Sequence, residues 1–211
     1  MPYLLEGAYA FAQYTGIERH TRDSDVFTRR EDAPRLLAAL REAGFETDVP
    51  YPYWLAKAHH GKDFVDVIYS SSNGLGRVDD AWFTHAPEQE VFGVPVRLVP
   101  AEEMIWHKAY VCERFDGADV AHLLRARAGE LEWGRLTTRF GAHWPLLAHL
   151  TFFGFIYPGE RHRLPQDVLR GPLIRLYAQK DLNTPEEKVC QGPRISREQY
   201  LPDVRTSARG T

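Results

Sequence analysis

Cysteine and long apolar runs are both scarce in this sequence of 211 residues. It has two cysteines, Cys112 and Cys190, which are too few for a disulfide framework or a four-cysteine zinc site. No uninterrupted apolar run approaches the roughly 18 residues that a membrane-spanning helix needs. The first residues lack the basic and apolar regions of a signal peptide. These absences predict a soluble, cytoplasmic protein that does not enter the membrane.

An excess of positive charge is also missing. Lysine and arginine number 26 against 29 aspartates and glutamates, so the net charge is −3. No overall basic field therefore draws the chain to nucleic acid or to an anionic membrane, and a polyanionic ligand must be held by a local cluster. The composition is otherwise that of a globular protein, with 44% hydrophobic and 26% charged residues, which excludes a disordered chain.

The first part of the sequence predicts alternating strands and helices. Gly7 lies where a short strand can turn into a helix, and residues 23–27 have the composition of a strand. A second helix is expected after Asp32, which is a plausible N-cap, with Pro34 in the first turn. Gly44 follows its apolar stripe and supplies the end.

The stretch from residue 45 to residue 98 is predicted to be rich in β-structure. Strands are expected at residues 53–60, 63–69 and 91–98. Gly61 and Lys62 between the first two indicate a hairpin. Gly93 and Pro95 place the third at the edge of a sheet.

After Pro100 the pattern becomes helical. Glu102 and Glu103 suit a first turn, and Asp116 is a candidate N-cap for the next helix. Aromatic residues of this half are expected to form its core or to line an acceptor pocket: Trp133, Trp144, Phe152, Phe153, Phe155 and Tyr157. The expected organisation is an α/β core at residues 1–99, a helical region at 100–182 and an extended or weakly ordered tail at 183–211.

Three aspartates are the candidate catalytic residues. Asp23 and Asp25 are two apart in a strand, so both carboxylates project from one side, roughly 6–7 Å apart along the chain. Oxygen ligands in this arrangement suit Mg²⁺. Asp66 interrupts a strand of Phe, Val and Ile, and it converges on the pair if the two strands are neighbours. Taken singly, each has a simpler interpretation: two aspartates at this spacing are common, and Asp66 could be an ion-pair partner.

A local cluster of cations precedes the aspartate pair. Arg19, His20 and Arg22 lie immediately before it, in a chain that is acidic overall. Arginine suits phosphate because its planar fork bonds two oxygens at once. The alternative is a solvated loop whose cations bind nothing.

Taken together, these segments resemble the nucleotidyltransferases of the DNA polymerase β superfamily, and most of all the small bacterial branch with toxin-type and antibiotic-modifying members. The resemblance is carried by Gly7-Ala8-Tyr9-Ala10, by Arg19-His20-Thr21-Arg22-Asp23-Ser24-Asp25, by Asp66, and by Lys108-Ala109, Arg114, Asp116 and Asp119. It covers roughly residues 4 to 125.

The resemblance implies an α/β fold with a small mixed sheet and flanking helices, followed by a mostly helical C-terminal half. It implies that Asp23, Asp25 and Asp66 are the catalytic residues and hold one or two Mg²⁺ ions. The nucleotide-binding residues would be Gly7, Arg19, Thr21, Arg22 and Lys108. The implied reaction is the metal-dependent transfer of a nucleoside monophosphate from a nucleoside triphosphate to an acceptor hydroxyl on a small molecule, a protein or RNA.

Two residues depart from the family pattern. Glu6 replaces the usual first glycine of a Gly-Gly turn, where a carboxylate opposes the nucleotide phosphates, and Ser24 replaces an aliphatic residue. These departures leave two alternatives open. One is a nucleotide-binding or protein-interaction module that has lost turnover, and the other is a toxin-like member of a toxin–antitoxin pair. The net charge of −3 argues against RNA as the acceptor.

Overall fold

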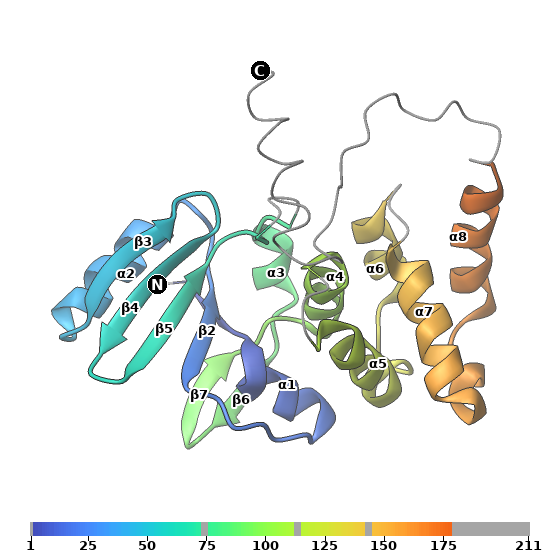
Figure 1. Ribbon diagram of the computed structural model, residues 1–211, viewed down its shortest axis with the longest axis horizontal. Helices are drawn as coiled ribbons and strands as arrows, with labels where there is room; N and C mark the ends of the chain where they lie inside the picture. The colour runs from blue at the N-terminus through green and yellow to red at the C-terminus, as the bar shows by residue number, and fades with distance from the viewer. Residues whose placement is uncertain (1, 73–75, 112–114, 142–144, 179–211) are drawn as a thin grey trace. The chain divides into compact units, whose positions relative to one another are not determined.

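The computed structural model describes residues 2–72, 76–111, 115–141 and 145–178, which divide between two compact units. The first unit, residues 1–104, contains the strands, and the second, residues 105–211, contains helices (Figure 1). The predicted α/β class with a helical C-terminal half is confirmed. Several features of the sequence lie outside the described residues: Cys112, Arg114, Trp144, Cys190 and the predicted tail at 183–211.

The first unit is built on a mixed sheet of five strands in the order β1-β2-β5-β4-β3. The strands are β1 (Leu4–Leu5), β2 (Asp23–Phe27), β3 (Glu46–Tyr51), β4 (Leu55–His60) and β5 (Asp63–Ile68). β2 and β5 run parallel, and the other neighbours are antiparallel. The predicted hairpin is confirmed, because β4 and β5 pair from His60 and Asp63 onward, with Gly61 at a φ of 62° in the turn.

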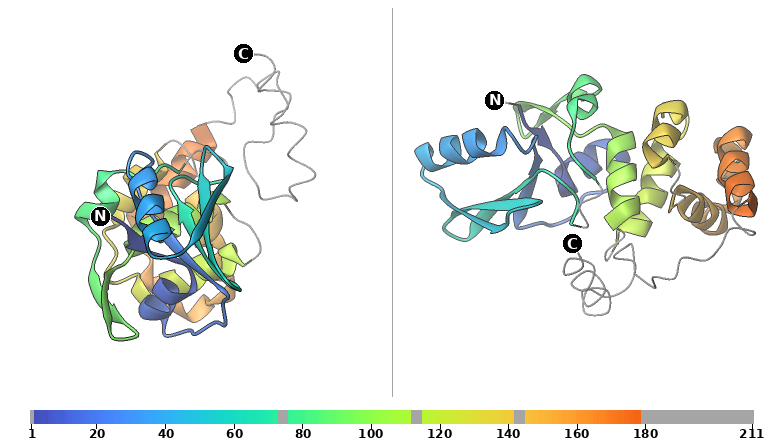
Figure 2. Two further views of the ribbon diagram at one scale, coloured as in Figure 1. Left: turned by 90° about the vertical axis from the view of Figure 1, so that its left-hand side faces the viewer. Right: turned by 90° about the horizontal axis from the view of Figure 1, so that it is seen from above.

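Helix α2 (Ala33–Glu42) covers one face of this sheet (Figure 2). Its Leu36 and Leu37 pack with Ala56 and Val67 in a buried apolar cluster. The helix and its N-cap residue Asp32 were predicted correctly, but the Asp32 side chain makes no capping hydrogen bond and instead accepts one from Arg29 Nη1 at 3.0 Å. Val26 and Val67 pack with α2, so alternation along the strands places Asp23, Asp25 and Asp66 on the opposite face of the sheet.

The predicted strand at residues 91–98 is instead the second half of a hairpin. Strands β6 (Glu88–Val91) and β7 (Val94–Arg97) pair in a separate two-stranded sheet. The turn consists of Phe92 and Gly93, with φ values of 52° and 76°, so both residues are left-handed as a tight hairpin turn requires. The helix α3 (Asp80–Thr84), capped by the Asp79 side chain, also interrupts the stretch predicted to be β-rich.

Helix α1 (Gly7–Thr15) follows β1 directly, as the sequence predicts. Ala10 and Phe11 are its buried residues, and Gly16 ends it in the left-handed conformation with a φ of 71°. The helix is tied to the chain before α4 by a hydrogen bond of 2.7 Å from the Tyr14 hydroxyl to the Val99 carbonyl. At the other end of the helix, the Glu6 N–H donates a hydrogen bond of 2.9 Å to the Asp25 carbonyl, which fixes the N-terminus of α1 beside β2.

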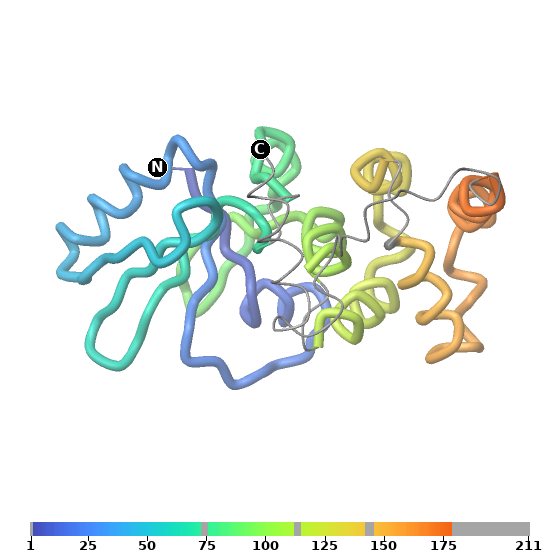
Figure 3. Tube along the Cα trace, turned by 45° about the horizontal axis from the view of Figure 1, so that its top comes forward, coloured from blue at the N-terminus to red at the C-terminus, as the bar shows by residue number. Residues whose placement is uncertain are grey.

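The chain after Pro100 is helical, and its path can be followed by colour in Figure 3. The helices are α4 (Ala101–Val111), α5 (Asp116–Arg127), α6 (Trp133–Phe140), α7 (Pro145–Ile156), the 3₁₀-helix η1 (Pro158–Arg163) and α8 (Gln166–Ala178). The α5 N-cap is Phe115 and not the predicted Asp116, which is the first residue of the helix. No helix among the described residues is both long enough and apolar enough to cross a membrane.

Only some of the aromatic residues expected in the helical core lie there. Phe153 is fully buried with Leu146 and Leu150, which share its face of α7. Phe152 and Phe155 are 42% and 75% exposed, because they project from the other side of the same helix. For these two residues the prediction of a core position was wrong.

Candidate functional site

The carboxylates of Asp23, Asp25 and Asp66 lie together on one face of the sheet. Parallel pairing of β2 with β5 places Asp25 directly beside Asp66, and Asp23 lies two positions earlier on the same face. One carboxylate oxygen from each residue lies within 4.8 Å of the others, and all three residues are half-buried. The convergence predicted from the sequence is therefore present, and the donor set of three hard oxygens fits a divalent cation such as Mg²⁺.

Lys57 is a member of this cluster that the sequence analysis missed. It lies opposite Asp66 in the β4–β5 hairpin, and its Nζ is 2.5 Å from Asp66 Oδ1. The ammonium also lies 4.4 Å from the centre of the Phe64 ring. The hairpin turn at Gly61 and Lys62 contained the signal, because a two-residue turn sets the register and pairs position 57 with position 66.

Thr21 lies against the first aspartate. Its hydroxyl donates a hydrogen bond to the Asp23 carboxylate, and the Asp23 backbone N–H lies 3.4 Å from the same hydroxyl oxygen. This contact orients the Asp23 side chain. Thr21 was predicted to bind nucleotide, and that role remains a prediction.

Gly7 is packed directly against the second aspartate. Its φ is 66°, in the region that favours glycine, and a Cβ at this position would overlap Asp25 Oδ2. The backbone around Gly7 can thus approach the carboxylate cluster only because the residue has no side chain. Gly7 at the start of α1 and Asp25 in β2 form one wall of the site.

Glu6 turns back on the start of its own helix. Its Oε2 accepts a hydrogen bond of 2.5 Å from the Gly7 N–H, and the side chain serves as the N-cap of α1. The residue is only 5% exposed, and its Oε1 is buried with no hydrogen-bond partner among the described residues. The carboxylate therefore occupies the N–H group that a phosphate at this helix N-terminus would use.

The cations predicted to bind nucleotide differ in their surroundings. Arg19 and Arg22 are exposed in the segment before β2, and the Arg19 guanidinium lies 4.5 Å from the centre of the Phe11 ring. Lys108, on α4, has its Nζ 3.2 Å from Asp116 Oδ1 and 3.1 Å from Asp119 Oδ2. Lys108 is thus held by two carboxylates of α5, and its contact with a nucleotide remains a prediction.

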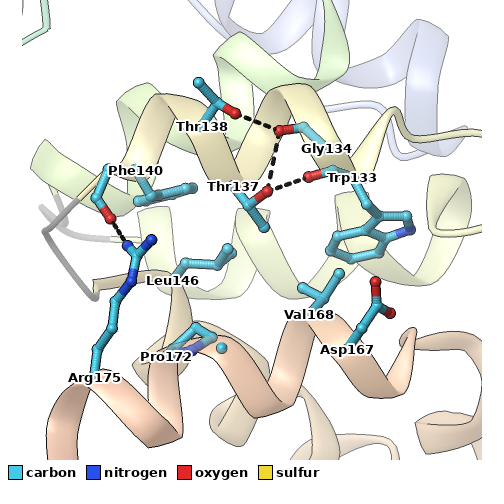
Figure 4. A pocket seen from close by; sticks show the side chains of 12 residues that line it. Trp133, Gly134, Thr137, Thr138, Phe140, Leu146, Asp167, Val168, Pro172 and Arg175 are labelled. Atoms are coloured by element: carbon cyan, nitrogen blue, oxygen red, sulfur yellow. Dashed lines mark hydrogen bonds between the residues drawn. The ribbon is translucent and has the colours of Figure 1, made fainter. Parts of the chain in front are cut away.

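The second unit contains a cavity of about 470 Å³ lined by residues of α6, α7 and α8 (Figure 4). Trp133 and Asp167 lie at one end, and Arg175 lies at the other, where it donates to the Gly141 carbonyl. The Trp133 indole N–H donates to the Ala128 carbonyl at 3.0 Å, so the ring is fixed in the cavity wall. Of the aromatic residues expected in an acceptor pocket that the structure describes, Trp133 lines this cavity.

No protein-family model matches the sequence, and no curated protein matches it. Similarity is found among solved structures. The lincomycin-bound crystal structure of the lincosamide antibiotic adenylyltransferase LnuA is 17% identical, with a TM-score of 0.43, over 60% of this chain and 87% of that chain. The crystal structure of ANT(2")-Ia in complex with adenylyl-2"-tobramycin is 18% identical, with a TM-score of 0.45, over 67% of this chain and 86% of that chain.

A third similar structure is an antigenic nucleotidyltransferase-like protein from Paracoccidioides brasiliensis, at 15% identity and a TM-score of 0.48, over 81% of this chain and 89% of that chain.

Proposed function

We propose that this chain is a metal-dependent nucleotidyltransferase that moves a nucleoside monophosphate from a nucleoside triphosphate to an acceptor hydroxyl. One observation carries the proposal. Asp23, Asp25 and Asp66 come from two parallel strands and bring one oxygen each within 4.8 Å, beside the glycine that begins α1. Three half-buried carboxylates repel one another unless a cation lies among them, and phosphoryl transfer is the chemistry that such a cation serves.

Asp23 and Asp25 are the residues proposed to hold the cation. A bound Mg²⁺ would offset the negative charge of the phosphates and of the transition state. Thr21 keeps the Asp23 carboxylate in place through its hydroxyl. Gly7 keeps the backbone of α1 close to Asp25, so the positive end of the helix faces the region where phosphates would lie.

Asp66 is proposed to accept the proton of the acceptor hydroxyl. The hydroxyl oxygen forms a bond to the α-phosphorus, and the bond from that phosphorus to the oxygen that bridges the α- and β-phosphates breaks. That oxygen leaves with pyrophosphate, and the hydroxyl proton passes to Asp66. Arg19 and Arg22 are proposed to bind the phosphates as positive charges. Pyrophosphate and the nucleotidylated acceptor are the products.

The test is pyrophosphate release from each nucleoside triphosphate, with and without Mg²⁺, in the presence of panels of hydroxyl-bearing acceptors. Asp23→Asn and Asp25→Asn should each lower the rate by at least about a hundredfold, since each removes a cation ligand. Asp63→Asn is the matched control, because Asp63 is an exposed aspartate of β5 outside the carboxylate cluster. Equal rates in Asp25→Asn, Asp63→Asn and the unchanged chain would disprove the assignment.

A further inference from the structure

Four charged residues form a row across four adjacent strands of the sheet. Asp25 in β2 is aligned with Asp66 in β5, Asp66 with Lys57 in β4, and Lys57 with Asp48 in β3. In an antiparallel pair, directly opposite residues have side chains on the same face and in contact distance. The row places one positive charge between acidic residues on both sides, and the sequence by itself does not show this order.

Lys57 forms its ion pair with Asp66 and not with Asp48. Its Nζ lies 2.5 Å from Asp66 Oδ1, whereas the Asp48 carboxylate is 3.0 Å from His59 Nε2. The Phe64 ring, 4.4 Å from the ammonium, adds a second favourable contact. The two side chains of the pair are 26% and 16% exposed, so the pair is shielded from water more than an ordinary surface ion pair.

This pairing changes the charge of the carboxylate site. Asp23, Asp25 and Asp66 together carry a charge of −3 when ionised, and Lys57 supplies a fixed +1 beside the third of them. The remaining charge of −2 matches one divalent cation. A second divalent cation bound at Asp66 would have to lie next to the Lys57 ammonium, and like charges at such a distance repel strongly where water is partly excluded.

We propose that Lys57 takes the place of a second metal ion: the site binds one divalent cation at Asp23 and Asp25, and Lys57 acts as the permanent counter-ion of Asp66. The proposal rests on the proposed function, and it specifies the metal requirement of the same site. Lys57 is then a positioning residue. It holds the Asp66 carboxylate in a fixed orientation beside the cation, so that Asp66 faces the acceptor hydroxyl and does not serve as a ligand.

The experiment measures Mn²⁺ binding to the full chain without nucleotide, by calorimetric titration and by the electron paramagnetic resonance signal of free Mn²⁺. We expect one Mn²⁺ per unchanged chain. Lys57→Gln removes the positive charge and keeps a polar side chain, so it should admit a second Mn²⁺ or tighten the first by about tenfold or more. Lys57→Arg keeps the charge and should retain a single site of unchanged affinity.

Two aspartate variants separate this inference from the proposed function. The double variant Asp66→Asn with Lys57→Gln removes both charges of the ion pair and keeps the net charge, so it should leave the single Mn²⁺ site within about threefold of its original affinity, whereas Asp25→Asn should abolish it. Two Mn²⁺ ions in the unchanged chain, or the same stoichiometry and affinity in Lys57→Gln, would overturn the role of Lys57 while the nucleotidyltransferase proposal stood. Absence of Mn²⁺ binding in the unchanged chain and in Lys57→Gln would overturn both. Circular dichroism spectra of the variants identify any that fail to fold.

Discussion

Gly7 lies so close to Asp25 that a Cβ on the glycine would overlap the Oδ2 atom of the carboxylate. The contact joins the start of α1 to the second strand of the sheet, and it combines with a φ of 66° that an L-residue rarely adopts. Both the close approach and the backbone conformation require glycine at this position. The site and the turn before α1 are therefore one structural feature.

The substitution Gly7→Ala should lower both the free energy of unfolding and the affinity of the site for metal. We expect a loss of about 3 kcal/mol in the free energy of unfolding, from left-handed strain and from displacement of Asp25, and a loss of Mn²⁺ binding. Gly16→Ala is a matched control, because Gly16 ends the same helix at a φ of 71° with no atom within 4 Å of the added Cβ. It should lose only about 1 kcal/mol and keep metal binding. Chemical denaturation and calorimetry provide both measurements, and equal effects of the two substitutions would contradict the contact with Asp25.

The position of Glu6 should lower the affinity for a nucleoside triphosphate. Its carboxylate occupies the Gly7 N–H, so Glu6→Gly should free that donor, remove a negative charge beside the phosphates and tighten binding by about tenfold or more. Glu6→Gln removes only the charge, because an amide oxygen still accepts from the N–H. Its affinity for the triphosphate should therefore lie between those of the unchanged chain and Glu6→Gly. Calorimetric titration with a non-hydrolysable triphosphate and Mg²⁺ measures the difference.

The outcome of that titration also distinguishes the proposed enzyme from a nucleotide-binding module that has lost turnover. Tight binding to the unchanged chain that Glu6→Gly does not alter would show that the phosphates do not use the Gly7 N–H, and it would contradict the competition. No binding to the unchanged chain, with strong binding restored in Glu6→Gly, would favour a module without turnover. The exposed Glu18→Gln serves as the control for a change in net charge alone.

Lys108 should contribute to stability through its two carboxylate partners. Its side chain is 14% exposed, and those of Asp116 and Asp119 are 16% and 6% exposed. Lys108→Met leaves the buried Asp119 carboxylate and the half-buried Asp116 carboxylate without their cation, so we expect a loss of about 3 kcal/mol in the free energy of unfolding. The double variant Lys108→Met with Asp119→Asn should recover part of it. Thermal and urea denaturation test this, and a neutral effect of Lys108→Met would contradict the importance of the ion pairs.

The buried position of His107 should make the free energy of unfolding depend on pH. Burial, aided by the positive charge of Lys108 and opposed by Asp116, lowers the pKa of His107 from 6.5 to about 4. Between these two values the unfolded chain binds a proton that the folded chain does not, so the free energy of unfolding falls as the pH falls. The contribution is fully present above pH 6.5 and is lost on the way down to about pH 4.

A His107→Gln variant tests that dependence. It should reduce the slope of unfolding free energy against pH by up to about 1.4 kcal/mol per pH unit within this window, because one proton no longer takes part. Urea denaturation at several pH values gives the slope. His162→Gln is the control, since His162 is exposed. Identical slopes in the unchanged chain and in His107→Gln would show that His107 has the same pKa in the folded and in the unfolded chain.

Local chemistry in the sequence was sufficient for several features of the fold. Alternation along a strand places Asp23 and Asp25 on one face, and the Gly61 turn determines the register of β4 and β5. The apolar stripe of α2 predicts the helix. Each of these depends on residues that are near one another in the chain, where spacing and turn chemistry decide the conformation.

Contacts between distant segments were decided only by the tertiary structure. Parallel pairing of β2 with β5 brings Asp66 beside Asp25, and this pairing depends on packing against α2 and on no turn signal between the strands. The hairpin at Phe92 and Gly93 escaped prediction because a non-glycine residue takes the left-handed conformation there.

The same distinction applies to the site. The sequence by itself determined which carboxylates are candidates for a metal site, because their residue type and spacing suit a hard cation. Tertiary structure decided what those carboxylates and their neighbours contact: Lys57 on Asp66, and Glu6 on the Gly7 N–H. Such side-chain partners are set when strands and helices pack and bring a charged group next to a donor. Where water is partly excluded, these interactions are strong, so they fix the positions of the side chains involved.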